Sequence, residues 1–134
     1  MEFQATDIGE PGPNEVVVDL QAAALNFRDV LISINMLPEL SYEGSYFGRH
    51  LGMEASGVIR SVGSNVQGLA VGDRVATAEA CCFGNRLVAP ASRVLKLPEN
   101  VSIEVAAASQ CTYNTAHHAL INVARIKKGT KKRL

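Results

Sequence analysis

The stretch EVVVDLQA, from Glu15 to Ala22, decides the fold class. It is rich in β-branched residues, and the run GEPGPN just before it has the glycine and proline content of a turn. Because side chains alternate across a strand, Val16, Val18 and Leu20 share one face. We therefore predict a β-strand with one apolar face.

Four further segments have the same character, and each is bounded by Gly, Asn, Asp or Pro. They are SGVIRSV from Ser56, RVATA from Arg74, NRLVAP from Asn85 and RVLKL from Arg93. Short strands at such intervals are typical of a β-sandwich or a partly open barrel. The sequence thus predicts a mainly β domain with short helices.

Two segments depart from the β pattern. The first, RDVLISINM from Arg28, has apolar residues at helical spacing and predicts a short helix. The second runs from Ser102 to Ile126, is rich in alanine and predicts a longer helical segment, with Gly129 as its stop. Its second half carries an apolar stripe, which consists of Ala116, Ala119, Leu120 and Val123.

Between Met36 and His50 lies a stretch rich in Pro, Gly, Ser and aromatic residues, which predicts a loop that covers part of the domain. A chain of 134 residues fits one modest core. We expect a β domain over 1–101, a helical segment over 102–129 and a basic tail over 130–134.

The net charge is zero, but the basic residues crowd the end of the chain. The last ten residues contain no acid and include Arg125, Lys127, Lys128, Lys131, Lys132 and Arg133. Such a run can touch phosphates, but a solvated terminus is the commoner case, so we predict no nucleic-acid partner.

The cysteines Cys81, Cys82 and Cys111 lack CxxC spacing and cannot form a disulfide framework, which indicates a reducing, cytoplasmic setting. The start, MEFQATDIGE, lacks the basic and apolar regions of a signal peptide. No apolar run approaches the length of a membrane span, so no membrane partner is expected.

Four motifs carry a family resemblance: AAALNFRDVL (22–31), LGMEASGVI (51–59), VGDRV (71–75) and TYNTAHHAL (112–120). In this order they resemble the medium-chain dehydrogenase/reductase superfamily, and most of all the enoyl reductase domains of type I polyketide and fatty acid synthases. The resemblance implies a GroES-like, partly open β-barrel followed by a C-terminal helical segment.

Full-length members of that family continue into a Rossmann domain that binds the nicotinamide dinucleotide. No GxGxxG run occurs among the eleven glycines of this chain, so the phosphate-binding turn of that half is missing. We expect the chain alone to bind NADPH poorly and to show no enoyl reductase turnover.

The resemblance also implies that the catalytic zinc of related alcohol dehydrogenases is lost. Their Cys, His and Cys ligands correspond to Asn26, Met53 and Cys111, and catalytic zinc needs three ligands. Their structural zinc loop is replaced by ATAEACCFGN. His50, His117 and His118 are expected to be structural or exposed, and the last two point about 100° apart on a helix.

By resemblance, NADPH would deliver a hydride to the β carbon of an α,β-unsaturated acyl thioester, and a proton would follow at the α carbon. Asn26 is expected to contact cofactor and substrate, although it also suits a helix N-cap. Thr115 is expected against the nicotinamide, with a local helix bond as its rival role. Glu54 is expected to be a structural carboxylate, and no residue of this half is assigned as catalytic.

An acyl channel is expected in the covering loop, where apolar walls suit a fatty chain and core packing is the rival explanation. Its candidate residues are Met36, Leu37, Tyr42 and Phe47. Some polyketide enoyl reductases have a Tyr near the position of Leu37, and Leu37 has no proton to donate. The expected partners are an acyl carrier protein and the missing Rossmann half.

Two other functions stay open. One is a zinc-free quinone oxidoreductase, and the other is a non-catalytic GroES-like binding module. In either case the Ala-rich helical tail lacks the domain it would normally pack against, so self-association is expected.

Overall fold

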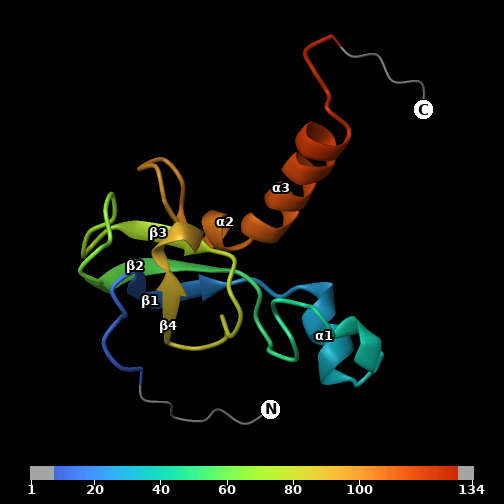
Figure 1. Cartoon of the computed structure of the whole chain (residues 1–134), viewed down its shortest axis with the longest axis horizontal. Helices are drawn as coiled ribbons and strands as arrows, with labels where there is room; N and C mark the ends of the chain where they lie inside the picture. Colours follow the sequence, from blue (N-terminus) through green and yellow to red (C-terminus); the bar gives the residue numbers. More distant parts are fainter. Residues whose placement is uncertain (1–7, 130–134) are drawn as a thin grey trace.

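A computed structural model describes residues 8–129. The basic tail over 130–134 and residues 1–7 of the MEFQATDIGE stretch lie outside the described residues. The described chain forms one antiparallel sheet, in the order β4-β1-β2-β3-β5 (Figure 1). Its strands are β1 (Glu15–Ala23), β2 (Ala55–Val62), β3 (Arg74–Thr77), β4 (Arg86–Pro90) and β5 (Val94–Lys96).

The core lies on one face of β1 and its neighbours. Val16 and Val18 are fully buried with Ile59 and Val75, and Leu20 packs against this cluster. The predicted apolar face of β1 is therefore confirmed. All five predicted strands are present, and the prediction of a mainly β domain with short helices is correct.

The helices are short. They are α1 (Phe27–Ser33), α2 (Ile103–Ala107) and α3 (Gln110–His117), followed by the π-helical turn η3 (His118–Val123). Two 3₁₀ turns, η1 (Glu39–Ser41) and η2 (Ala91–Arg93), complete the described elements. The first half of the covering loop thus contains a 3₁₀ turn.

The predicted helical segment is present, but it is interrupted and ends before Ile126. It breaks at Ala108 and Ser109, where the Ser109 hydroxyl donates to the carbonyl of Ala106 at 2.9 Å. Helical geometry stops after Val123, and Arg125 takes a positive φ of 50°. The stop predicted at Gly129 was therefore placed too late, because a non-glycine residue ends the helix first.

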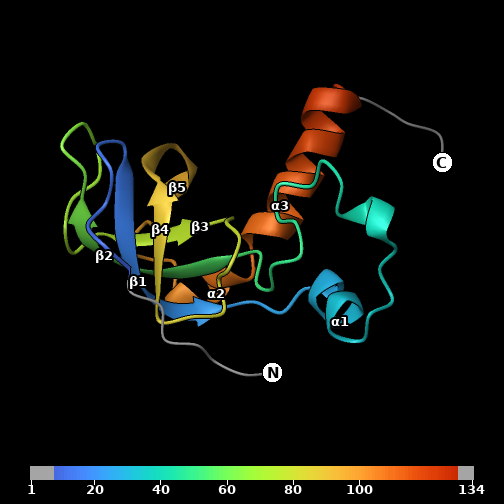
Figure 2. The same cartoon turned by 60° about the horizontal axis from the view of Figure 1, so that its bottom comes forward.

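The α2 helix packs on the sheet through the buried residues Ala106 and Ala107, whereas α3 leads away from it (Figure 1). The view in Figure 2 shows α1 and the covering loop beside the sheet, on the side where α3 leaves it. No residue of α3 or η3 is buried, so the predicted apolar stripe is exposed. Within residues 8–129 no helix has the length and apolarity that crossing a membrane requires.

Candidate active site

The start of α1 is anchored by a buried carboxylate. Asn26 is the N-cap residue, and its backbone N–H donates to Asp29 Oδ2 at 2.8 Å. Asp29 Oδ1 accepts from the backbone N–H of Gly52 at 2.9 Å, and Asp29 is 1% exposed. A carboxylate in the first turn suits the unpaired N–H groups and the dipole of a helix. Asp29 therefore fixes α1 to the chain that leads into β2.

Gly52 passes very close to the turn that follows β3. A Cβ atom at this position would lie 2.6 Å from the backbone nitrogen of Phe83, and φ is +80°. The Gly52 carbonyl also accepts a hydrogen bond from the Cys82 N–H at 3.3 Å. Only glycine combines this φ with such an approach, so Gly52 positions the residues that follow it.

Glu54 is the centre of the site. It is 2% exposed, and its Oε1 accepts from the side-chain amide Nδ2 of Asn26 at 3.0 Å. Its Oε2 accepts from the backbone N–H of Cys111, in the first turn of α3, at 2.8 Å. Glu54 is thus a buried, hydrogen-bonded carboxylate, as predicted.

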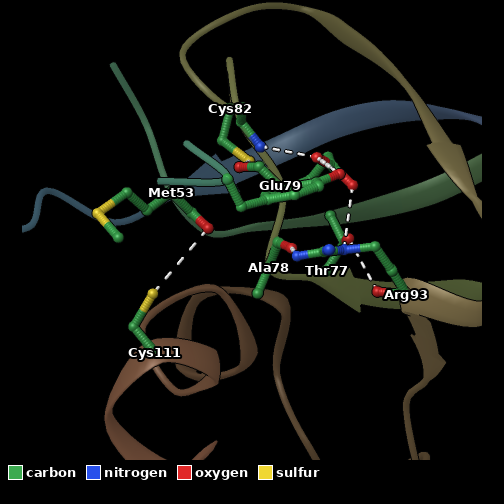
Figure 3. A network of polar contacts seen from close by, with 9 residues as sticks. Met53, Thr77, Ala78, Glu79, Cys82, Arg93 and Cys111 are labelled. Atoms are coloured by element: carbon green, nitrogen blue, oxygen red, sulfur yellow. Dashed lines mark hydrogen bonds and ion pairs between the residues drawn. The ribbon is translucent and has the colours of Figure 1, made fainter. Parts of the chain in front are cut away.

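The three positions equated with zinc ligands gather around Glu54. Asn26 bonds it directly, Met53 precedes it, and Cys111 donates to it. The dashed line in Figure 3 joins Cys111 Sγ to the carbonyl oxygen of Met53, 4.0 Å away. Three segments that are distant in the sequence therefore meet at Glu54. This is expected if the three positions correspond to the zinc ligands of related dehydrogenases.

The surroundings of Cys111 disfavour its thiolate form. Burial, followed by the negative charges of Glu54 and Asp29, raises the pKa of Cys111 to about 11. It is therefore a neutral thiol at pH 7. In the part of the chain that the structure describes, no group of three or more His, Cys, Asp or Glu residues is arranged to hold a metal ion. All three histidines are exposed.

Thr115 lies one helical turn after Cys111, on the same side of α3, and is exposed. Its hydroxyl makes no hydrogen bond among residues 8–129, so the rival local helix bond is not formed there. Thr115 therefore lies on the exposed surface of α3.

The four candidate acyl-binding residues differ in exposure. Met36 is 66% exposed, whereas Leu37, Tyr42 and Phe47 are half-buried. Tyr42 lies under the guanidinium groups of Arg28 and Arg49, at 5.7 and 4.2 Å from its ring centre. Packing within the covering loop therefore accounts for part of this set.

Two open cavities lie elsewhere on the described surface. One, of about 380 Å³, separates the end of β1 from the turn 82–85. The other, of about 410 Å³, lies between residues 92–95 and the side chains of Gln110 and Asn114 on α3. Neither is lined by Asn26 or by the four acyl-binding candidates.

A second polar cluster was missed by sequence reasoning (Figure 3). Glu79 is 6% exposed and accepts from the Tyr46 hydroxyl and from the Ala80 N–H. Arg93 Nε lies 3.3 Å from Glu79 Oε2, and its guanidinium stacks 3.7 Å from the centre of the Tyr46 ring. These residues are far apart in the sequence and form no motif, so no local signal pointed to them.

Comparison with known proteins identifies the family of this chain. Residues 12–99 match the family model described as the alcohol dehydrogenase GroES-like domain. The highly reducing polyketide synthase gloL of Glarea lozoyensis is 41% identical over 118 residues, which are 88% of this chain and 4% of that synthase. The chain therefore spans a small part of this relative.

Two solved structures share the fold. The CurK enoyl reductase is 28% identical with a TM-score of 0.84, and the match covers 94% of this chain and 40% of that one. The quinone oxidoreductase of Escherichia coli in complex with NADPH is 29% identical with a TM-score of 0.69, and the match covers 92% of this chain and 36% of that one. The predicted GroES-like fold is confirmed.

Proposed function

Because the chain belongs to the family of alcohol dehydrogenase GroES-like domains, we propose that it is the catalytic-side portion of an NADPH-dependent enoyl reductase. Its substrate would be an α,β-unsaturated acyl thioester on the acyl carrier protein of a polyketide or fatty acid synthase. Resemblance to reducing polyketide synthases and to enoyl reductase domains supports an oxidoreductase of this type. Residues 1–101 would form the catalytic-side domain, and 102–129 would lead to the cofactor half.

The observation that carries this proposal is the bond between Asn26 and Glu54. A carboxylate only accepts hydrogen bonds, so the nitrogen of the Asn26 amide must face Glu54 and the amide oxygen must face away. The second N–H of this amide is then left for a ligand. Hydride transfer demands such preorganised polar groups when no metal polarises the acceptor.

The cofactor would be held only in part by this chain. The Asn26 amide and the Thr115 hydroxyl offer the neutral donors and acceptors that suit a nicotinamide carboxamide, and Glu54 ties their two helices together. When bound, NADPH would supply the hydride. The chain contains no GxGxxG run, and in this proposal the phosphates would be bound by a Rossmann domain such as full-length members of the family have.

The covering loop would form the acyl-binding wall. Leu37, Tyr42 and Phe47 present half-buried apolar surface beside α1, and Met36 is open to a substrate. Such surfaces exclude water from a reacting centre. Leu37 has no proton to give, so we assign no catalytic acid within this chain.

A quinone oxidoreductase is the second candidate, since the Escherichia coli enzyme shares the fold. The higher TM-score of the CurK enoyl reductase, 0.84 against 0.69, favours enoyl reduction. A non-catalytic binding module is the third reading, and it predicts no activity in any context.

The test joins this chain to the part of the CurK enoyl reductase that it does not cover. With crotonyl thioester the chimera should oxidise NADPH faster than with a quinone, and N26A should lower kcat about tenfold or more. The matched control E99Q, at an exposed loop position, should leave kcat unchanged. Preference for the quinone would move the assignment to the second candidate. A folded chimera inactive on both substrates would support the binding module.

A further inference from the structure

The covering loop, residues 36–50, has two attachments of different kinds. On one side Arg28 of α1 donates from Nη2 to the Gly48 carbonyl at 2.7 Å and to Ser45 Oγ at 3.4 Å. On the other side Tyr46 donates its hydroxyl to Glu79, in the turn after β3. Among residues 8–129, the Tyr46 bond is the hydrogen bond between this loop and the sheet or the turns that connect its strands.

Glu79 is an unusual residue at that junction. Its side chain is 8% exposed, and its Oε2 is buried without a hydrogen bond. A buried carboxylate is costly unless an opposite charge compensates it. Arg93, from η2, supplies that charge at 3.3 Å and also donates from Nη2 to the Ala78 carbonyl at 3.1 Å.

Arg93 contacts the loop as well as the carboxylate. Its guanidinium carbon lies 3.7 Å from the centre of the Tyr46 ring, which is the geometry of a cation–π contact. Tyr46 is therefore held twice, by its hydroxyl on Glu79 and by its ring on Arg93. Both contacts come from residues outside the covering loop.

We propose that Arg93, Glu79 and Tyr46 form a clamp that positions the covering loop against the β domain. The clamp holds the turn 78–82 and η2 together and offers Tyr46 one docking place. Its three members are positioning residues, since they act on the loop through contacts with one another. That the clamped loop shapes an acyl-binding wall rests on the proposed function, but the clamp itself does not.

Hydrogen–deuterium exchange of the complete 134-residue chain, without cofactor or substrate, tests this proposal. In Y46F the hydroxyl bond is lost and the ring stack is kept, so exchange over 36–50 should rise about tenfold. R93K keeps the charge but loses the planar stack and should give a smaller rise. Y46L removes both contacts and should exceed Y46F. Exchange over β1 should stay unchanged in all three variants.

The matched control is E39Q. Glu39 pairs with Arg49, and both residues belong to the covering loop, so this exposed ion pair adds no link to the β domain. E39Q should leave exchange over 36–50 within about twofold of the wild type. Tyr46 is 54% exposed, so Y46F should fold even if variants of the buried Glu79 do not.

Three results would overturn the clamp. They are unchanged exchange over 36–50 in both Y46F and R93K, an equal rise in E39Q and Y46F, and an equal rise over β1 and over 36–50 in Y46F. The last would show a general role in stability instead of positioning. None of them bears on the reductase chimera, and its failure would leave the clamp intact.

Discussion

Asn26 on α1 donates its side-chain amide to Glu54 at 3.0 Å, and the same carboxylate accepts from the first turn of α3. One buried side chain thus ties together two helices, one ending at Ser33 and the other beginning at Gln110. The position of the proposed ligand groups, Asn26 and Thr115, depends on this link.

Replacing Glu54 by Gln should destabilise the fold. A Gln side chain is uncharged and has one accepting oxygen, so the Cys111 N–H exchanges a charged acceptor for a neutral one, and the Asn26 amide must turn over to present its oxygen to the Gln nitrogen. We expect the free energy of unfolding in urea to fall by about 1–3 kcal/mol. The exposed control E99Q should change it by less than about 0.5 kcal/mol. Equal stability of E54Q and the control would contradict the central role of Glu54.

Two alanine substitutions separate backbone strain from steric conflict. Gly52 and Gly68 have φ values of +80° and +78°, but a Cβ lies 2.6 Å from the Phe83 nitrogen at the first and meets nothing within 4 Å at the second. G68A should therefore cost about 1 kcal/mol and G52A about 3 kcal/mol or more in urea unfolding. If G52A and G68A lose the same unfolding free energy, the backbone at residues 82–83 moves aside at little energetic cost.

The Tyr46–Glu79 bond should appear in alkaline titration. The hydrogen bond to Glu79, with lesser effects of burial and of the nearby negative charge, raises the pKa of Tyr46 above its usual value of about 10. Because the folded pKa is raised, the contribution of Tyr46 to stability is complete below about pH 10 and is lost as the pH rises through the folded pKa. The stability difference between wild type and Y46F should shrink from pH 8 to pH 11, and a constant difference would contradict the bond.

The wild-type chain should retain no zinc after washing with a chelator, whereas N26C/M53H should bind about one ion per chain. Those changes restore two side chains beside Cys111, and a bound metal would deprotonate its thiol in spite of the raised pKa. Binding should therefore tighten as the pH rises. Neither single substitution should suffice. Metal analysis that finds the double variant no better than wild type would show that these positions are not arranged as a ligand set.

The helical end of the described chain should promote self-association. Tyr113, Leu120 and Val123 are 72%, 49% and 68% exposed, on an arm that leads away from the sheet. Sedimentation velocity should reveal concentration-dependent dimers, and L120E should weaken them. V71E, at an apolar position that is 64% exposed in a turn, should not. A monomer at every concentration would refute the expectation.

The strands were predictable because alternation and turn residues are local signals. The fifth prediction began at Arg93, but residues 91–93 form a 3₁₀ turn and β5 starts at Val94. The helical segment was predicted correctly in kind, but the sequence did not reveal its break at Ala108 and Ser109. Alanine content favours a helix, but the Ser109 hydroxyl bonds to the Ala106 carbonyl at the break between α2 and α3.

The candidate site was partly predictable. Resemblance pointed to Asn26, Met53, Glu54 and Cys111, and the structure joins them through hydrogen bonds. The roles of Asn26 and Thr115 in binding stay predictions. The cluster of Tyr46, Glu79 and Arg93 depends on tertiary contacts between residues 33 and 14 positions apart, for which the sequence holds no period or spacing.

The outer strands of the sheet bear on how concentrated solutions of this chain behave. β4 has five residues and ends at Pro90, and β5 has only three. Proline has no backbone N–H to donate. Edge strands this short also offer few backbone groups for pairing with an added strand. Ordered fibrils built by sheet extension are therefore disfavoured, and any assemblies should dissolve on dilution.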